Sequence, residues 1–265
     1  MTTTQLLETA LTASLKAGEE ILNVYNSDFA IEHKEDKSPL TEADKRGHNA
    51  IVSQLEGTDL PILSEEGKSI DFDARSKWEM FWMVDPLDGT KEFIKRNGEF
   101  TVNIALIEKD TPIGGVIYVP VHKTLYIAGP EFGSYKVKNV EPNCSETISD
   151  LLKKGEKLPA NHADQIYTVV ASRSHMSEET ASFIEAVKKE KGAVETMSRG
   201  SSLKLCMVAE GSANAYPRYA PTMEWDTAAG DAICRLAGFS VTQYQTDNPL
   251  VYNKENLLNP WFLVK

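Results

Sequence analysis

Two aspartates, three positions apart, follow an apolar run in the first half of the sequence. Phe81–Val84 indicates a buried strand, and Asp85-Pro86-Leu87-Asp88-Gly89-Thr90 follows it directly. Because proline cannot extend a central strand, we expect the chain to turn at Pro86 and to bring Asp85 and Asp88 close together. Two carboxylates about 4 Å apart repel each other by roughly 4 kcal/mol, so a protein keeps such a pair by protonating one or by binding a cation. A solvated turn that carries two acids is the alternative interpretation.

Three other acids stand where a carboxylate could serve the same chemistry. Glu65 ends a second short apolar run, and open α/β folds bind ligands at the carboxyl ends of strands. Asp44 lies three residues after Thr41 in a capping-box pattern, and Asp226 falls in the first turn of another predicted helix. Each acid also has a local alternative: a solvated loop for Glu65, capping for Asp44 and the helix dipole for Asp226.

A glycine and two hydroxyl residues, Gly200-Ser201-Ser202, precede a predicted helix from Leu203 to Ala209. The free backbone N–H groups at the N-terminus of a helix can bind an anion. Ordinary N-capping of the helix by Ser201 is the alternative interpretation.

The chain has 265 residues, with 28 Lys or Arg against 39 Asp or Glu and a net charge of −11. This balance argues against binding to nucleic acid polymers or to an anionic membrane, because both need a basic footprint. A small phosphorylated substrate is compatible with it if metal ions reverse the local potential. The cysteines lack disulfide or zinc spacing, and no segment has the pattern of a signal peptide or membrane span. We therefore expect a cytoplasmic protein without stable membrane insertion.

The elements that must position these residues form two successive groups. In the first, helical periodicity covers residues 4–25 and 41–55, with a charged hairpin or loop between them. After Thr90, β-rich segments separated by turn signals predict antiparallel hairpins, at residues 100–107, 114–121, 124–128 and 133–137. This order is unlike a Rossmann fold, and the sequence has no Gly-x-Gly-x-x-Gly or Walker A motif.

Residues 138–165 are polar and contain two prolines, so we interpret them as the connection between two halves. The second half alternates strands at 167–172, 193–197, 213–217 and, last, 239–244 with helices at 177–191, 203–209 and 223–236, the last helix capped by Thr222. We expect an N-terminal half, residues 1–137, that carries most of the metal ligands. The C-terminal half, residues 138–265, would complete the substrate pocket within one compact unit.

Taken together, three motifs resemble those of the inositol monophosphatase superfamily of lithium-sensitive, magnesium-dependent phosphatases. They are Ser64-Glu65-Glu66, Asp85-Pro86-Leu87-Asp88-Gly89-Thr90 and Trp225-Asp226-Thr227-Ala228-Ala229-Gly230, in this order. Within the superfamily, the run from Lys91 to Leu106 is similar to that of the bacterial 3'(2'),5'-bisphosphate nucleotidases of sulfate assimilation. Gly200-Ser201-Ser202-Leu203-Lys204 and Tyr216-Pro217-Arg218 carry the same resemblance.

The resemblance implies a five-layered αβαβα sandwich, an α/β fold that agrees with the two groups of elements. It implies metal ligands at Glu65, Asp85, Asp88 and Asp226 and at the backbone carbonyl of Leu87. Hard oxygen ligands of this kind suit Mg²⁺, and we expect two or three ions.

The resemblance further implies direct hydrolysis of a phosphomonoester. Asp44 and Thr90 would orient and deprotonate the attacking water, and Glu65 would assist through its metal. Gly89 and Thr90 offer backbone N–H groups to the phosphate, and Asp88 and Asp226 would position an ion at the leaving oxygen. The expected catalytic residues are Asp44, Glu65 and Thr90, and the expected substrate-binding residues are Glu65, Leu87, Asp88, Gly89, Thr90, Ser201, Lys204, Arg218 and Asp226.

The expected reaction, part of sulfur assimilation, is hydrolysis of the 3'-phosphate of adenosine 3',5'-bisphosphate to AMP and phosphate, with the 5'-phosphosulfate analogue as a further substrate. Lys204 and Arg218 are candidates for binding the 5'-phosphate or the nucleotide, unless both are merely solvated. An inositol or sugar phosphatase and a catalytically silent nucleotide sensor are the alternatives. The sequence leaves open whether the protein is a monomer or a homodimer, and whether it contacts the inner face of the cell membrane.

Overall fold

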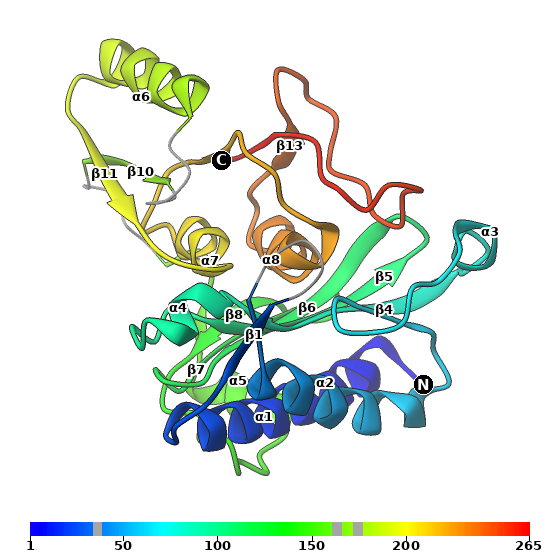
Figure 1. The fold of residues 1–265 in the computed structure, drawn as a ribbon. Coiled ribbons are helices and arrows are strands. Elements are labelled where there is room, and N and C mark those ends of the chain that lie inside the picture. Colours follow the sequence, from blue (N-terminus) through cyan, green and yellow to red (C-terminus); the bar gives the residue numbers. More distant parts are fainter. Residues whose placement is uncertain (34–38, 161–165, 172–176) are drawn as a thin grey trace.

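The elements of the computed structural model stack in five alternating layers of helices and strands (Figure 1). The structure describes residues 1–33, 39–160, 166–171 and 177–265. Helices α1 (Thr3–Tyr25) and α2 (Glu42–Leu55) form one outer layer beneath a seven-stranded sheet. Beyond the sheet lie α7 (Leu203–Glu210) and α8 (Glu224–Leu236), then small sheets, then α6 (Glu178–Lys191). The predicted αβαβα sandwich is confirmed.

The first outer layer is an amphipathic helix pair. Apolar side chains recur along α1 at three- and four-residue steps and are buried in a core shared with α2 and the sheet. Thr2 begins a capping box at the start of α1, and Thr41 and Asp44 form another at the start of α2. The strands β1 (Ile31–His33) and β2 (Pro39–Thr41) pair antiparallel, and the rest of the predicted hairpin lies outside the described residues.

The large sheet has the strand order β3-β4-β5-β6-β7-β8-β9. Strands β3 and β4 are parallel and each later pair is antiparallel, which confirms the predicted hairpins. One apolar core lies between this sheet and the α1–α2 pair, and a second lies between the sheet and α7–α8. The strands are β3 (Ile62–Ser64), β4 (Met80–Asp88), β5 (Thr101–Glu108), β6 (Thr111–Val119), β7 (Thr124–Gly129), β8 (Gly133–Val137) and β9 (Glu156–Lys157).

The prediction that the chain turns at Pro86 is wrong, because β4 continues through Pro86 to Asp88. On one side, β3 pairs only with residues 82–84 of β4, so no ladder bond on that side needs the missing N–H of the proline. On the other side, the pairing with β5 shifts register between Asp85 and Asp88. Pro86 therefore lies in an irregular stretch of ladder that tolerates it.

The second half of the chain builds two small sheets above α7 and α8. Strands β10 (Tyr167–Ala171) and β11 (Val194–Ser198) are parallel, and α6 lies between them in the sequence. Strands β12 (Tyr216–Arg218), β13 (Val241–Gln243) and β14 (Phe262–Val264) are antiparallel, with β14 in the centre.

Some elements of the second half differ from the prediction. Residues 138–165 are more than a connection, because helix α5 (Ile148–Lys154) packs on the first core and β9 extends the large sheet. The last strand is β14, and only β13 is regular within residues 239–244. Helix α8 begins after Met223, and the hydroxyl of Thr222 accepts a hydrogen bond from Asn259 (3.3 Å) instead of capping the helix.

The remaining helices are short: the 3₁₀ turn η1 (Glu56–Thr58), α3 (Phe72–Arg75) and α4 (Thr90–Ile94). None of the helices in the described part of the chain combines the length and apolar character that a membrane crossing needs.

Helix α8 approaches its neighbours closely because glycines stand at the contacts. A Cβ atom on Gly115 of β6 would lie 2.5 Å from the carbonyl oxygen of Ala229 in α8. A Cβ atom on Gly230 of α8 would lie 2.6 Å from a side-chain carbon of Leu205 in α7. Because Gly115 and Gly230 have no side chains, α8 can pack closely against β6 and α7, and this close packing sets the position of its first turn.

We expect Gly115→Ala to lower the free energy of unfolding by about 1–3 kcal/mol, because the added methyl group meets helix backbone. Gly57→Ala is the matched control, since among the described residues no atom beyond the two chain neighbours lies within 4 Å of a Cβ atom at that position. Urea denaturation of both variants measures the difference. Wild-type stability of Gly115→Ala would contradict the close packing of α8 on β6.

Candidate active site

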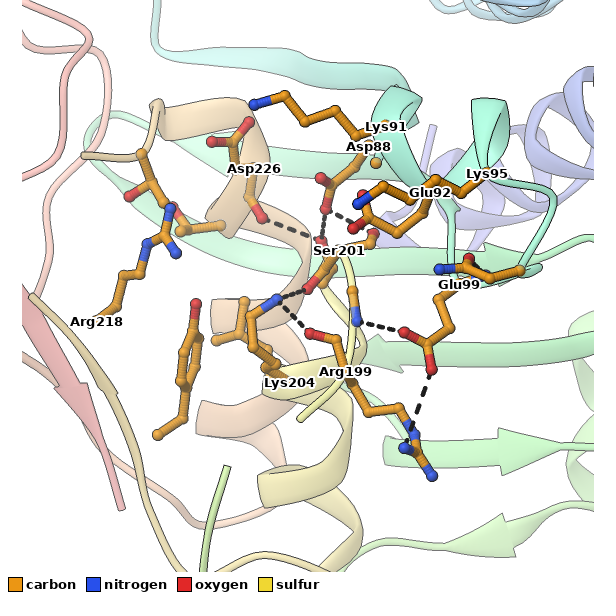
Figure 2. Close-up of a pocket in the computed structure, with 18 residues that line it drawn as sticks. Asp88, Lys91, Glu92, Lys95, Glu99, Arg199, Ser201, Lys204, Arg218 and Asp226 are labelled. Carbon is orange, nitrogen blue, oxygen red and sulfur yellow. Dashed lines mark hydrogen bonds and ion pairs between the residues drawn. The ribbon is translucent and has the colours of Figure 1, made fainter. Parts of the chain in front are cut away.

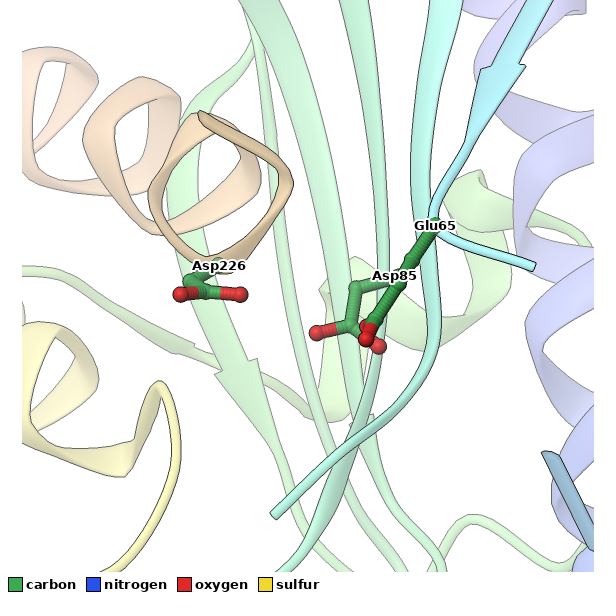
Figure 3. Close-up of side chains that lie close together, drawn as sticks. All are labelled: Glu65, Asp85 and Asp226. Atoms are coloured by element: carbon green, nitrogen blue, oxygen red, sulfur yellow. The ribbon is translucent and has the colours of Figure 1, made fainter. Parts of the chain in front are cut away.

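Two carboxylates meet where two parallel strands lie side by side. Glu65 directly follows β3, and Asp85 lies in β4 next to Val84, which is in register with Ser64. The backbone N–H of Glu65 donates to the carbonyl oxygen of Val84 over 3.1 Å. Asp226 comes from the first turn of α8, on the other side of the site (Figure 3). Ligand oxygens of Glu65, Asp85 and Asp226 lie within 4.8 Å of one another, close enough to hold a metal ion.

This acidic cluster is electrostatically unfavourable by itself. Asp85 is 1% exposed, and burial, followed by the charges of Glu65 and Asp88, raises the pKa of its carboxyl well above the usual range. Burial, followed by repulsion from Asp88, raises the pKa of Asp226 to about 8. A divalent cation would relieve the repulsion, and carboxylate oxygens are the donors that Mg²⁺ prefers. The residues therefore fit the metal that the family resemblance implies.

Asp88, another predicted metal ligand, falls outside this three-carboxylate group among the described residues. Its Oδ2 atom accepts hydrogen bonds from the hydroxyls of Ser201 (2.8 Å) and Ser202 (2.6 Å). Asp88 nevertheless lines the same cavity as the cluster, together with the predicted ligand Leu87. The structure thus joins three of the predicted carboxylates closely and places Asp88 beside them.

Asp44 caps helix α2 and faces the site at the same time. Its Oδ2 atom accepts a hydrogen bond of 2.7 Å from the backbone N–H of Thr41, as the capping box predicts, and another of 2.7 Å from the Thr41 hydroxyl. Its Oδ1 atom accepts from the hydroxyl of Thr90 over 3.2 Å. The two interpretations of Asp44 are therefore compatible, since each uses one oxygen of a carboxylate that is 2% exposed.

Gly89 turns the chain from β4 into α4 with a φ of 96°, in the left-handed region that favours glycine. A Cβ atom there would lie 3.3 Å from the carbonyl oxygen of Glu99 and from the Cβ atom of Ser201. The turn therefore lets the loop after α4 and the segment before α7 close around one cavity.

Another part of the cavity presents cations (Figure 2). Lys204 is 7% exposed and donates to the backbone carbonyls of Ser201 (2.6 Å) and Arg199 (3.2 Å). These acceptors are neutral, and no ion pair to Lys204 occurs among the described residues. Burial lowers the pKa of Lys204 to about 8, so the side chain stays protonated at neutral pH. A buried cation that has no carboxylate partner within the described part of the chain is suited to receive an anionic ligand.

Arg218 lines the same part of the cavity. One terminal nitrogen of its guanidinium donates to the carbonyl oxygen of Pro221 over 2.8 Å. Its Nε atom is buried and has no hydrogen-bond partner among the described residues. The guanidinium therefore keeps donor capacity for a ligand.

The alternative interpretation of Ser201 as an ordinary N-cap is wrong. Ser202 occupies the N-cap position of α7, and its side chain makes no capping hydrogen bond. Ser201 precedes it with a φ of 53°. Both hydroxyls donate to Asp88 instead, so the side chains at the start of α7 bind a residue of the site and leave the helix N-terminus without a side-chain cap.

Our sequence reasoning missed Thr101 and Asn103, two buried polar residues of β5. The Asn103 amide donates to the hydroxyl of Ser202 (2.7 Å), and its oxygen accepts from Thr101 (2.8 Å). A signal was present, since Asn103 interrupts an apolar strand, and a buried amide there needs partners. The sequence reasoning also missed residues that line the cavity itself, among them Lys91, Glu92, Lys95 and Glu99.

The fold and the acidic cavity define a known class of protein. The profile of the inositol monophosphatase family matches residues 2–261, and this chain belongs to that family. It is 41% identical over 263 residues to the 3'(2'),5'-bisphosphate nucleotidase CysQ of Salmonella typhimurium, which covers 98% of this chain and 99% of the relative. It is 40% identical to the protein of the same name from Escherichia coli K12, with the same coverage.

Solved structures agree with this assignment. The crystal structure of CysQ from Bacteroides thetaiotaomicron, a bacterial member of the family, has a TM-score of 0.91 and 51% identity, covering 99% of this chain and 97% of that chain. The extragenic suppressor protein suhB from Bartonella henselae has a TM-score of 0.73 and 22% identity, covering 98% and 93%. The second comparison supports the fold alone.

We expect Mg²⁺ to raise the melting temperature of the wild-type protein, because a ligand that binds the native state stabilises it. Asp85→Asn should abolish this rise. In the absence of metal, the Asp85→Asn variant should melt no lower than the wild-type protein, because the substitution removes a buried carboxylate that repels its neighbours. Asp73→Asn removes an exposed aspartate of α3 and is the matched control. Scanning calorimetry at increasing Mg²⁺ makes the measurement. A wild-type melting temperature that Mg²⁺ leaves unchanged would contradict the metal site.

Proposed function

We propose that this protein is a metal-dependent 3'(2'),5'-bisphosphate nucleotidase that hydrolyses the 3'-phosphate of adenosine 3',5'-bisphosphate to AMP and phosphate. The observation that carries the proposal is a cavity with clustered carboxylates at one end and the cations Lys204 and Arg218 at the other. The linings of the acidic part and of the part around Lys204 share Asp88, Gly89 and Asp226. A substrate with one phosphate to cleave and another to bind fits this arrangement. The full-length similarity to proteins named 3'(2'),5'-bisphosphate nucleotidase supports the same substrate class.

The acidic end would hold Mg²⁺. Glu65, Asp85 and Asp226 are placed to bind a cation together. Asp88 and the carbonyl of Leu87 line the same space and would complete the oxygen donors. A divalent cation bound here supplies positive charge that polarises the phosphate and makes water a stronger acid.

Thr90 and Asp44 are suited to take a proton from the attacking water. The Thr90 hydroxyl donates to Asp44 Oδ1, which leaves Thr90 Oγ1 able to accept a hydrogen bond from water. As water attacks phosphorus, its proton passes to Thr90 while the Thr90 proton passes to Asp44. Thr41 holds the other oxygen of Asp44 and thereby fixes the carboxylate for this transfer.

Lys204 and Arg218 would bind the second phosphate of the substrate. A phosphate oxygen would give the buried Lys204 its missing counter-ion and could accept from the unpartnered Nε of Arg218. An inositol monophosphate has only the phosphate to be cleaved and would leave Lys204 without a counter-ion. The cation pair therefore favours a bisphosphate over the inositol alternative.

Lys204 should govern the alkaline side of the pH profile. Because burial lowers its pKa to about 8, Lys204 loses its positive charge, and its attraction for phosphate, as the pH rises through this value. We expect kcat/KM for the bisphosphate to fall above about pH 8, since this ratio follows ionisations of the free enzyme. Lys204→Met should lack this decrease and have a kcat/KM about tenfold lower at neutral pH. A decrease of the same shape in Lys204→Met would contradict the assignment.

The deciding experiment is phosphate release with Mg²⁺ from adenosine 3',5'-bisphosphate and inositol 1-phosphate in parallel. We expect strong preference for the nucleotide, a kcat at least about 10²-fold lower in Asp44→Asn and a raised KM in Lys204→Met. Lys77→Met removes an exposed lysine and is the control. Preference for inositol 1-phosphate would overturn the proposed substrate. No release from either compound despite metal binding would indicate a nucleotide sensor.

A further inference from the structure

Asp88 is held by donors from two separate parts of the chain. Its Oδ2 atom accepts from Ser201 (2.8 Å) and Ser202 (2.6 Å), which precede α7, and from the Asn103 amide of β5 (3.3 Å). Figure 2 shows Ser201 next to Asp88, with the hydrogen bond between them drawn as a dashed line. Asp88 is the last residue of β4 and is followed by the glycine turn, so strand pairing beyond it does not fix its side chain.

The Ser202 side chain is oriented toward Asp88 and not toward the helix that it precedes. It stands at the N-cap of α7, where a serine hydroxyl usually accepts from a backbone N–H of the first turn, and it makes no such bond. Its oxygen accepts from the Asn103 amide over 2.7 Å, which directs its proton toward Asp88. The same hydroxyl lies 3.1 Å from the carbonyl oxygen of Asp226. One side chain therefore hydrogen-bonds β4 and β5 and contacts the first turn of α8.

The network around Ser202 is shielded from water. Thr101, Asn103 and Ser202 are each no more than 2% exposed. The Thr101 hydroxyl donates to the Asn103 oxygen (2.8 Å) and lies 2.7 Å from the Ser201 hydroxyl, so polar contacts connect β5 to the segment before α7 beside Asp88. With the Thr101 proton on Asn103 and the Ser201 and Ser202 protons on Asp88, each of these hydroxyl protons has a buried acceptor, which favours this arrangement.

We infer that Ser202, oriented by Asn103, is a positioning residue that fixes the rotation of the Asp88 carboxylate relative to Asp226. With Oδ2 occupied by hydroxyl donors, Oδ1 is the oxygen that Asp88 presents to a cation. This inference rests on the proposed function, since it assigns Asp88 to the metal. Groups that orient metal ligands through hydrogen bonds typically change metal affinity by 10- to 100-fold when they are removed.

The test compares Ser202→Ala with Ser14→Ala. Ser14 is also a buried serine, but its hydroxyl donates to the Leu11 carbonyl within α1, far from the site. The melting temperature of each variant is followed across a Mg²⁺ titration, which gives an apparent Kd apart from the stability of the metal-free protein. We expect Ser202→Ala to bind Mg²⁺ at least about tenfold more weakly. Ser14→Ala should keep the wild-type Kd even if it melts at a lower temperature.

Asn103→Leu extends the test if Ser202→Ala does not fold. It removes the amide that orients Ser202 and should weaken Mg²⁺ binding in the same direction. Wild-type Mg²⁺ affinity in a folded variant, whether Ser202→Ala or Asn103→Leu, would overturn the positioning role, whatever its effect on stability. Absence of any Mg²⁺ effect on the wild-type protein would instead overturn the proposed function, so the two failures are distinguishable.

Discussion

The site depends on the mutual repulsion of three carboxylates, one buried and two partly buried, where β3, β4 and α8 meet. An apolar residue at any of these places would be more stable in the metal-free protein, because a buried carboxylate loses its hydration. The fold nevertheless brings Asp226 to Asp85 by letting α8 sit against Gly115 of β6. The favourable packing of α8 on β6 therefore holds Asp226 near Asp85, and the repulsion between these carboxylates persists until a cation neutralises it.

The site uses the two oxygens of a carboxylate for separate purposes. One oxygen of Asp44 accepts a hydrogen bond in the cap of α2, and the other accepts one from the Thr90 hydroxyl. In Asp88 one oxygen belongs to the serines before α7, and in Asp85 one accepts from the backbone N–H of Leu87 (3.0 Å). Hydrogen bonds to the protein thus settle the orientation of each acid before a ligand arrives, which is the condition for electrostatic catalysis.

The parts of the molecule that could be predicted from the sequence depend on residues close together in the chain. The capping box at Asp44 and the hairpins after Thr90 are of this kind, and family motifs identified the acids. The errors involve distant partners. Ser201, which we considered as an N-cap, binds Asp88, 113 positions earlier, and Pro86 stays in a strand because its neighbours leave that stretch of ladder irregular. β14 was missed because three residues are too few to show a period.

The place of β14 has a consequence for how a growing chain assembles. This strand lies between β12 and β13 although it follows both in the sequence, and it pairs Phe262 with Arg218. During synthesis, all strands of the large sheet are available once β9 at Glu156–Lys157 has left the ribosome, whereas the small sheet that contains Arg218 needs the chain up to residue 264. The strand ends at Glu65 and Asp85 can therefore pair first, and the small sheet that holds Arg218 is the last to be completed.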